Sequence, residues 1–363
     1  MKPKLTRNVR LTRPEEGGRG AIAPARRLDR FLLTNPHIGR ILSRSARALL
    51  TAMIWPRFVA PYRWQLTRHT LALANLGRAF EGYKVLHLTD FHAGYTRLSY
   101  LESVIDACLH ENPHLILITG DLIDYHPPAL PAIEKLLQRL TRNHPRVIAI
   151  FGNHDYHEFS WRHIGPRSAC RAIHKRLVAI VESSGVRLLR NEHVRIAPPH
   201  LPQSPLAPEL APGLNLSPAN KTSHSTPPES APHRDLVIVG LDEMWTSLAD
   251  PHAAFHALSP QDPILCLQHN PDGVEFLKPF PWQAMLCGHS HGGQALFPIV
   301  GPLYVPMEHR HYLSGFFRFP PLPDQPPALR ERLMFVSRGL GHSTPIRFRC
   351  PPEATLFTLR CAT

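Results

Sequence analysis

Residues 115–124 read LILITGDLID. The apolar, β-branched run at the start of this stretch is typical of a strand that is buried on both faces of a sheet. Gly120 ends the run, and glycine allows the backbone to turn sharply directly after a strand. Asp121 and Asp124 follow at once, so two carboxylates lie where the strand ends. The stretch therefore predicts a buried strand that carries polar side chains at its carboxyl end.

Four further segments repeat this order of an apolar run followed by residue types that bind metals. The runs are residues 85–89, 147–151, 264–268 and 284–287, and they lead into Asp90 and His92, into Asn153 and His154, into His269, and into His289 and His291. Each motif alone is weak, because Gly-Asp is a common turn and a single histidine is usually structural. Five such elements in succession are not expected by coincidence. Since ligands in α/β sheets bind at the carboxyl ends of strands, we expect these side chains to gather at one edge.

Helical spacing separates the first strands of this series. Apolar residues recur at three- and four-residue steps over residues 98–110 and again over residues 131–142. Apolar runs that alternate with such helices predict an α/β fold in which helices cover the faces of a sheet.

The residue types at these strand ends suit transition-metal cations. Asp90 and His92 are two positions apart, so on an extended strand both side chains leave the backbone on the same side. Asp121 offers two oxygens, which is enough to bridge two cations. Oxygen and imidazole ligands without thiolates favour Mn, Fe, Zn or Co over Ca. Two such cations about 3.5–4 Å apart stabilise the attacking and leaving oxygens of a phosphoryl displacement.

The positive charge of the chain is confined to its N-terminal part. Residues 1–80 carry 16 Lys or Arg and 3 Asp or Glu, which is the whole net charge of +13, whereas residues 81–363 carry 25 of each sign. Residues 1–27 are rich in Arg, Gly and Pro, and we expect a disordered basic arm. Residues 28–80 are predicted to form an amphipathic helix, up to about residue 54, and a lead-in segment.

A basic amphipathic helix of this kind can lie on an anionic membrane surface. Packing of the helix on the body of the protein is the alternative, and nucleic-acid binding is a weaker one. We expect no nucleic-acid partner, because residues 81–363 are neutral and the arm carries no recognition motif. The sequence indicates no protein partner.

Cysteine usage and hydropathy bear on the cellular location. The six cysteines lack CxxC spacing, which favours buried thiols in a reducing compartment. No apolar run approaches the roughly 20 residues of a membrane span, and no secretory signal is evident. We therefore expect a cytoplasmic protein, peripheral on the inner face of the cytoplasmic membrane. Residues 198–234 are rich in proline and are predicted to form a flexible insert without a catalytic role.

Taken in order, the five motifs resemble the signature of calcineurin-like metallophosphoesterases. The motifs are Asp90-x-His92, Gly120-Asp121-x-x-Asp124, Gly152-Asn153-His154-Asp155, His269 and Gly288-His289-x-His291. The resemblance runs from about residue 83 to residue 359, apart from the insert. It implies a four-layer α/β/β/α sandwich with two mixed sheets, in a domain that spans residues 81–363.

The resemblance also implies roles for single residues around two divalent metal ions. The first metal would be held by Asp90, His92 and His291, the second by Asn153, His269 and His289, and Asp121 would bridge the two. A water activated by the metals would attack phosphorus. His154, oriented by Asp124, would stabilise the developing charge or protonate the leaving oxygen. Asp155 would only buttress the loop. Manganese is the metal we expect first, with Fe, Zn or Co as alternatives.

A narrower resemblance concerns the stretches GHSHGGQ at 288–294 and SRGLG at 337–341. They are similar to a membrane-associated branch of the family, which includes general phosphodiesterases and the chlamydial-type UDP-2,3-diacylglucosamine pyrophosphatase of lipid A synthesis. Residues near the motif loops could contact phosphate or nucleotide. These are Arg97, Tyr125, His157 and Gln294. Aromatic residues such as Trp245, Phe316 and Phe317 could line an acyl groove, with ordinary core packing as the alternative.

The resulting hypothesis is a peripheral-membrane phosphodiesterase or pyrophosphatase that acts on a lipid-linked diphosphate. The best single substrate is UDP-2,3-diacylglucosamine, cleaved to UMP and 2,3-diacylglucosamine 1-phosphate. A broad-specificity phosphodiesterase or phosphatase on soluble substrates is the first alternative. A non-catalytic, membrane-tethered binding module is the second, and the complete ligand set speaks against it.

Overall fold

The computed structural model describes residues 54–124, 129–142, 146–156, 167–197, 234–302, 305–342 and 344–362. The predicted basic arm and nearly all of the predicted amphipathic helix lie outside these ranges. So does nearly all of the proline-rich insert. Tyr125 and His157 lie outside them as well, so their predicted contacts with substrate stay predictions.

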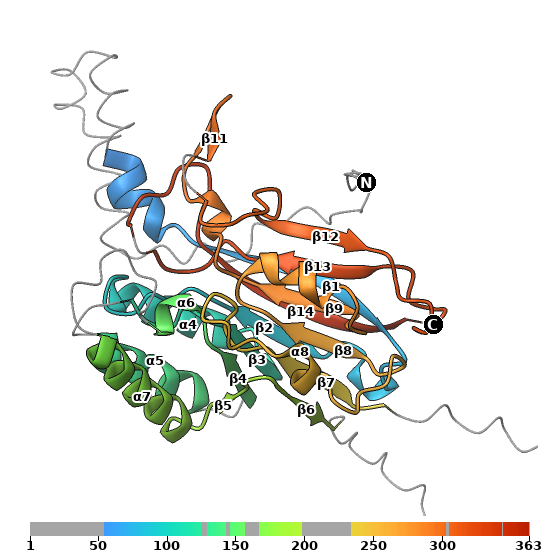
Figure 1. The fold of residues 1–363 in the computed structure, drawn as a ribbon. Coiled ribbons are helices and arrows are strands. Elements are labelled where there is room, and N and C mark those ends of the chain that lie inside the picture. The colour runs from blue at the N-terminus through green and yellow to red at the C-terminus, as the bar shows by residue number, and fades with distance from the viewer. Residues whose placement is uncertain are drawn as a thin grey trace, which may run out of the picture.

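Two six-stranded sheets face each other at the centre of the molecule (Figure 1). The first sheet has the order β1 (Gln65–Ala74), β14 (Glu353–Ala362), β2 (Lys84–Leu88), β3 (Leu115–Thr119), β4 (Arg146–Ile150) and β5 (Arg187–Leu188). The second has the order β12 (Gly315–Phe319), β13 (Arg332–Val336), β9 (Ala284–Cys287), β8 (Ile264–Leu267), β7 (Leu236–Gly240) and β6 (Glu192–Ile196). Both sheets are mixed: β14 runs antiparallel to β2, and β12 and β6 run antiparallel to their neighbours. A separate hairpin pairs β10 (Leu296–Phe297) with β11 (Gly301–Pro302).

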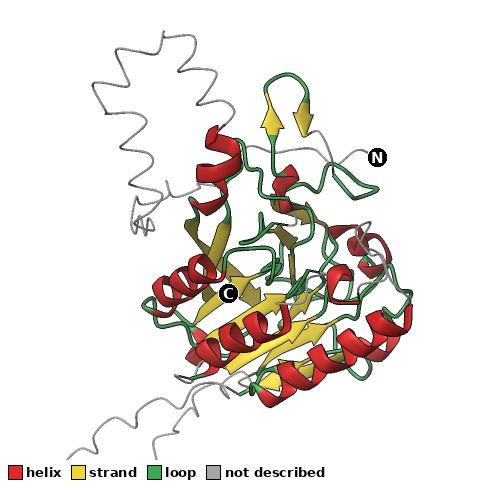
Figure 2. Cartoon of the chain, turned by 90° about the vertical axis from the view of Figure 1, so that its left-hand side faces the viewer, coloured by secondary structure: helices red, strands yellow, loops and turns green. Residues whose placement is uncertain are grey.

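Helices cover the outer face of the first sheet (Figure 2). They are α4 (Leu98–Leu109), α5 (Ala129–Thr141) and α7 (Arg167–Ser183). The outer face of the second sheet is covered more thinly, by loops and by the four-residue helices α8 (Pro251–Ala254) and α9 (Val274–Leu277). The four-layer α/β/β/α prediction is confirmed, and the predicted helices at 98–110 and 131–142 correspond to α4 and α5.

Alternation along the strands divides the core into layers. In β2, Val85 belongs to the core between the two sheets, whereas Leu86 belongs to the core under α4 and α5. The outer face of the second sheet has its own apolar cluster around the buried Trp282. Because each face of each sheet removes apolar surface from water, the relative position of the two sheets is fixed by packing.

The domain begins before residue 81, where the sequence analysis placed its start. Strand β1 lies within the expected lead-in segment and pairs with β14 along its whole length, from Gln65–Glu353 to Ala74–Ala362. Its C-terminal residues, including Leu71 and Leu73, are buried in the core between the sheets. The N-terminal half of this edge strand is exposed or half-buried and has a mixed polar sequence, so no run of apolar residues marks it as a strand.

The cysteines of the chain are thiols, as the sequence predicts. All six cysteines are free, and five of them are buried. No helix within the described ranges is both long enough and apolar enough to cross a bilayer.

The buried His87 generates a prediction about acid stability. Its imidazole lies between the sheets, with Nε2 2.7 Å from Thr119 Oγ1, and burial lowers its pKa from 6.5 to about 3. Above pH 6.5 both the folded and the unfolded chain hold a neutral imidazole. As the pH falls towards 3, only the unfolded chain takes up the proton, so stability is lost through this window. We expect His87→Gln to reduce that loss by up to about 3 kcal/mol at pH 4.

Urea unfolding at pH 7 and pH 4 measures the effect as a difference between the two free energies of unfolding. His110→Gln, a change at an exposed histidine, is the matched control. Equal acid sensitivity of the wild type and His87→Gln would contradict the prediction.

Candidate metal centre

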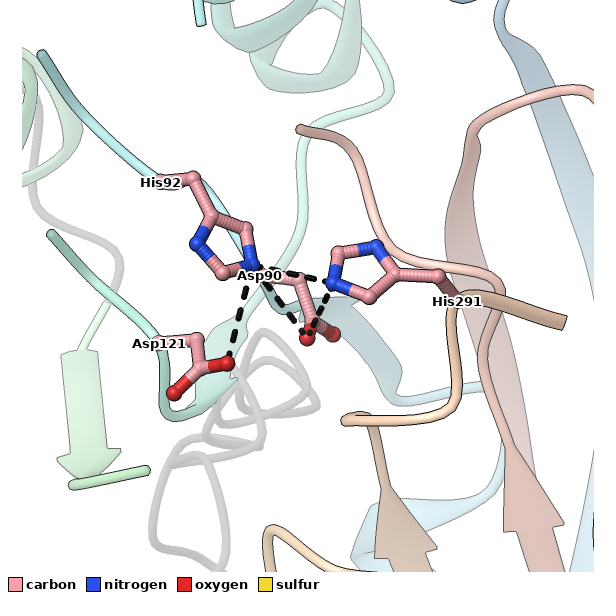
Figure 3. Close-up of side chains that lie close together, drawn as sticks. All are labelled: Asp90, His92, Asp121 and His291. Carbon is pink, nitrogen blue, oxygen red and sulfur yellow. Dashed lines mark hydrogen bonds and ion pairs between the residues drawn. The ribbon is translucent and has the colours of Figure 1, made fainter. Parts of the chain in front are cut away.

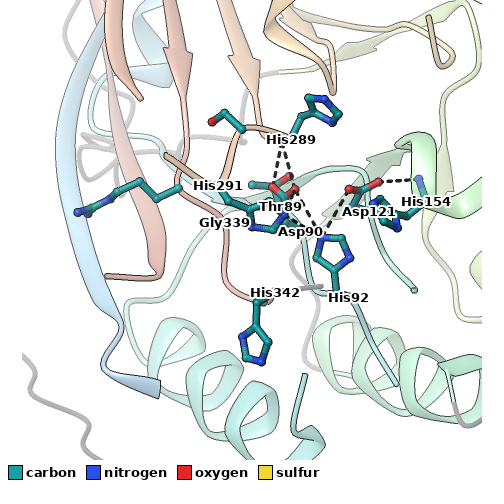
Figure 4. A network of polar contacts seen from close by, with 12 residues as sticks. Thr89, Asp90, His92, Asp121, His154, His289, His291, Gly339 and His342 are labelled. Atoms are coloured by element: carbon teal, nitrogen blue, oxygen red, sulfur yellow. Dashed lines mark hydrogen bonds and ion pairs between the residues drawn. The ribbon is translucent and has the colours of Figure 1, made fainter. Parts of the chain in front are cut away.

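Five strand ends from the two sheets meet at one edge of the sandwich. Strands β2, β3 and β4 of the first sheet and β8 and β9 of the second all run parallel to their neighbours in this series. Hydrogen bonds cross between the sheets at this edge: the backbone N–H of His289 donates to both oxygens of Asp90, at 3.1 and 3.2 Å (Figure 4). Thr119 O accepts from His269 Nδ1 at 2.6 Å. The seven predicted ligands are therefore brought together, three from the second sheet and four from the first.

The prediction that Asp90 and His92 leave an extended strand on the same side is wrong. Strand β2 ends at Leu88, and both ligands lie beyond it in left-handed backbone, with φ of 55° for Asp90 and 44° for His92. Asp121, His289 and His291 also have positive φ, between 50° and 66°. This conformation costs roughly 1–2 kcal/mol per residue without glycine, and such strain collects at functional sites. The loops, not the pleat of a strand, aim these side chains.

Gly120 and Gly152 are needed at these strand ends for different physical reasons. Gly120 has φ of +91°, which confirms a left-handed turn after β3. Gly152 is required for close approach instead, because a Cβ on it would lie 2.3 Å from Asp121 Oδ1 and 2.7 Å from His269 Nε2. Glycine at 152 thus makes room for the ligands.

The first half-site is formed by Asp90, His92, Asp121 and His291, all of them buried (Figure 3). His92 Nε2 lies 2.9 Å from His291 Nε2 and 3.6 Å from Asp121 Oδ2, and His291 Nε2 lies 3.4 Å from Asp90 Oδ1. Adjacent ligand atoms around a cation with bonds of about 2.1 Å are separated by about 3.0–3.4 Å in octahedral or tetrahedral geometry. The four ligand atoms all lie within 4.8 Å of one another, so these side chains could hold one divalent cation.

The second half-site is formed by Asn153, His269, His289 and the same Asp121. The carbonyl oxygens of Thr119 and Pro306 can only accept, so His269 carries a proton on Nδ1 and His289 carries its proton on Nε2. The other two nitrogens, His269 Nε2 and His289 Nδ1, face into the site and are the atoms that could bind a cation. Asp121 and Asp90 outweigh burial and raise the pKa of His269 to about 10, so its Nε2 holds a proton that a bound cation would displace. His289 Nδ1 lies 2.8 Å from Asn153 Oδ1, and the lone pairs of these two atoms repel each other unless a cation lies between them.

One oxygen of Asp121 faces both half-sites. Its Oδ2 lies 3.6 Å from His92 Nε2 and 3.3 Å from His269 Nε2, while Oδ1 accepts from the backbone N–H of His154 at 3.0 Å. Burial alone would raise the pKa of this carboxyl, but His269, His154 and His92 outweigh burial and hold the pKa well below its ordinary value. Asp121 is thus ionised and placed to bridge two cations.

His154 lies at the edge of the centre, and Asp124 orients it. His154 Nδ1 is 3.1 Å from Asp124 Oδ1, and the side chain of Asp124 is buried. Burial lowers the pKa of this imidazole, but Asp121 and Asp124 together raise it to about 9. The pair can therefore present a protonated imidazole next to the ligands. Asp155 accepts from the backbone N–H groups of Gly152 and Ile123, which matches the buttressing role expected from its position.

Arg347 is a site residue that the sequence reasoning missed. It is fully buried and donates to the carbonyl oxygens of His291 at 3.0 Å and Gly341 at 2.7 Å. Its guanidinium also lies 3.3 Å from His291 Nδ1. The Gly341 loop in turn donates to the backbone of Asp90 at 2.7 Å. Arg347 therefore ties two ligand loops together, and because His291 lies 56 positions away, the residues around Arg347 do not indicate this role.

The predicted substrate contacts are only partly placed. Arg97 is exposed, with its guanidinium over the ring of Tyr62 at 4.7 Å. The amide nitrogen of Gln294 donates to Thr344 O at 2.8 Å and Ile346 O at 3.2 Å, so this side chain holds a neighbouring loop, and its contact with substrate stays a prediction.

Of the aromatic candidates for an acyl groove, one lies beside the metal centre and two pack in the apolar cores. Trp245 makes an edge contact with the ring of His289 at 4.7 Å and lies beside the centre. Phe316 and Phe317 pack against the cores on either side of the second sheet, Phe316 against the core between the two sheets and Phe317 against the outer one. The alternative of ordinary core packing holds for these two residues.

Comparison with known proteins gives one family and several relatives. The family model for calcineurin-like phosphoesterases matches residues 83–293. The chain is 28% identical over 324 residues to phosphodiesterase YaeI of Escherichia coli (strain K12), covering 88% of this chain and 98% of that protein. It is 28% identical over 342 residues to UDP-2,3-diacylglucosamine pyrophosphatase LpxG of Chlamydia muridarum, covering 89% and 98%. It is 25% identical to the uncharacterized metallophosphoesterase YkuE of Bacillus subtilis (strain 168), covering 84% and 89%.

The shared oxygen of Asp121 predicts how metal content responds to substitution. We expect about two divalent ions per chain in the wild type, well below one in Asp121→Asn, and about one in Asn153→Ala, which removes a ligand of the second half-site only. Mass spectrometry of the desalted protein measures the metal content. Asp324→Asn, at an exposed carboxylate, is the control. Loss of a single ion in Asp121→Asn would place that carboxylate in one half-site alone.

Proposed function

The chain belongs to the calcineurin-like phosphoesterase family and is a metal-dependent hydrolase of phosphoric esters or anhydrides, and from that premise we propose a specific reaction for it. The reaction is hydrolysis of a lipid-linked diphosphate on the inner face of the cytoplasmic membrane. The best candidate substrate is UDP-2,3-diacylglucosamine, which yields UMP and 2,3-diacylglucosamine 1-phosphate.

One observation carries the chemical part of this proposal: seven oxygen and nitrogen donors from two sheets converge at one edge, with one oxygen of Asp121 facing both halves. A relative named as a UDP-2,3-diacylglucosamine pyrophosphatase aligns over 98% of its length and supports the substrate. The basic N-terminal 80 residues support a substrate at an anionic surface.

The chain's own residues supply positions and protons. Asp90, His92 and His291 would hold the first cation, Asn153, His269 and His289 the second, and Asp121 both. When bound, two divalent cations, Mn first among the candidates, supply Lewis-acid stabilisation of the phosphoryl oxygens and a nucleophilic water at neutral pH. The carbonyl oxygens of Thr119 and Pro306 keep His269 and His289 in the tautomers that ligation requires.

His154 is placed to act on the leaving group. Its imidazole is held by Asp124 at 3.1 Å, and Asp121 and Asp124 outweigh burial and raise its pKa to about 9, which favours the protonated form. In this position it donates a proton to the departing oxygen or stabilises the negative charge that develops there.

A broad-specificity phosphodiesterase on soluble substrates is the second candidate function. It is favoured by the relative named as a phosphodiesterase, which is also 28% identical and is covered over 98% of its length. The two functions share the same centre and differ only in what lies beyond the scissile bond.

The substrate proposal is tested with purified full-length protein and Mn²⁺. UDP-2,3-diacylglucosamine in mixed micelles is the lipid substrate, and bis-p-nitrophenyl phosphate is the soluble one. We expect UMP release that is lost in Asp121→Ala. Turnover of the soluble diester alone would retain the chemistry and reject the lipid substrate.

The role of His154 predicts a dependence on the leaving group. His154→Gln should lower kcat by about 10²–10³ for a diester with an alkoxide leaving group, which requires a proton. The loss should be less than about tenfold for p-nitrophenolate, which leaves as a stable anion. Steady-state rates on the two substrates measure this difference. Equal losses on both would indicate that His154 acts on binding or on charge in the attacking step instead.

A further inference from the structure

Exposed apolar side chains gather on one face of the molecule. Seven large apolar side chains are exposed among the described residues, and five of them lie on three short segments. The segments are residues 54–63, 294–302 and 344–349, which together we call the hairpin face. The five side chains are Phe58, Phe297, Ile299, Val300 and Ile346. Scattered apolar residues on a surface need no explanation, but a cluster of this kind marks an interaction site.

Ile299 and Val300 form the tip of this face. They lie in the turn between β10 and β11, and they are the most exposed of the five, at 106% and 68% of their full exposure. Figure 1 and Figure 2 both show the hairpin projecting from the body at the same end as the helical turn η1 (Trp55–Val59). An isoleucine and a valine held away from the body in a paired turn have no function in the core.

Direct contacts hold the three segments together. Leu296 N donates to Phe348 O at 3.0 Å, and the rings of Phe297 and Phe348 stack at 5.4 Å. Arg347 N donates to Pro56 O at 2.8 Å, and the guanidinium of Arg57 donates to Pro345 O at 3.2 Å. The apolar tip and the helical turn are therefore parts of one continuous surface.

The charge of this surface is positive. Arg57, Arg63 and Arg349 are exposed on the hairpin face, and its three segments contain no Asp or Glu. Residues 1–53, which join the face directly at Ile54, carry 12 Lys or Arg against 3 Asp or Glu. Apolar side chains rimmed by arginines match the boundary between anionic headgroups and acyl chains.

The same chain segment links this face to the metal centre. His291, a ligand of the first half-site, lies three residues before Gln294, where the hairpin face begins. Arg347 is buried beneath the face and donates to the backbone carbonyl oxygen of His291 at 3.0 Å. A surface that contacts the hairpin tip is therefore connected to the ligand loop by a few residues.

We propose that the hairpin face docks on an anionic bilayer, with Ile299 and Val300 inserted among the acyl chains and the arginines on the headgroups. This inference deepens the membrane part of the proposed function and rests on it for the identity of the surface. It gives a lipid-linked substrate a short path from the bilayer to the ligand loop. A second copy of the chain is the competing occupant of this face, but two such faces would bring like charges together.

Vesicle binding by the full-length protein tests the proposal. The probes are vesicles of phosphatidylethanolamine with phosphatidylglycerol and vesicles of phosphatidylcholine alone. We expect the wild type to sediment with the anionic vesicles, and Ile299→Asp with Val300→Asp to lower the partition coefficient by about tenfold or more, because two carboxylates replace the inserted side chains. Leu248→Asp is the matched control, since Leu248 is 43% exposed and lies outside the hairpin face. It should partition like the wild type.

Hydrolysis of bis-p-nitrophenyl phosphate separates this inference from the proposed function. All variants should retain it, since neither Ile299 nor Val300 is part of the metal centre. Absence of turnover in the wild type would reject the proposed chemistry, and the vesicle result would still decide whether the hairpin face binds the bilayer. Equal partition of the wild type and the double variant would overturn the inference, and so would a wild-type dimer that the double substitution dissociates.

A second variant guards against a folding defect. In Ile299→Trp, subtraction of the wild-type emission spectrum leaves the fluorescence of the new tryptophan. The maximum of this difference spectrum should shift to shorter wavelength when anionic vesicles are added. An unchanged difference spectrum would place the tip in water and overturn the inference.

Discussion

The burial of the Asp121 carboxylate between the two sheets is the constraint on which the rest of the centre depends. Removing a carboxylate from water is unfavourable unless opposite charge and hydrogen bonds compensate it. Here the compensation comes from the imidazoles of His269 and His154, whose pKa values Asp121 raises against the effect of burial to about 10 and about 9, and from the backbone N–H of His154. Left-handed backbone at five ligands and the absence of a Cβ at Gly152 follow from the need to crowd these groups around one oxygen. A divalent cation on each side would complete the compensation, because each half-site gathers carboxylate, amide and imidazole ligand atoms around the same carboxylate.

Groups around the centre that bind no metal fix the tautomers and the positions of the ligands. The tautomers of His269 and His289 are fixed by Thr119 and Pro306, and the position of His291 is fixed by Arg347. Arg347 comes from a loop that also packs on the hairpin, through its neighbour Phe348. The same loop therefore contacts a ligand of the metal centre through Arg347 and the exposed hairpin through Phe348. It connects the metal centre to the surface that we assign to the bilayer.

The positions of the strands and of the ligands could be predicted because both are local signals. A buried strand shows itself as an apolar run, and a ligand shows itself as a polar residue directly after that run, as in residues 115–124. The side chains of the predicted catalytic pair, His154 and Asp124, also lie within hydrogen-bond distance. In contrast, the number of sheets could not be predicted from the pattern of apolar residues, because a run of apolar residues does not say which strand lies beside it. That pattern indicated a single sheet with helices on its faces, and only the family resemblance indicated two sheets.

Other features depended on contacts between residues far apart in the chain. Strand β1 is held by β14, nearly 290 positions away, so its polar sequence gave no sign of a strand. Arg347 is buried and Ile299 is exposed, opposite to what their side chains suggest one by one. The amino-acid order alone established the strands, the ligand types and their edge of the sheet, since backbone period and turn chemistry act over a few residues. Tertiary structure alone established the ligand distances, the tautomers, the role of Arg347 and the exposed hairpin, because these arise where distant segments pack or fail to pack.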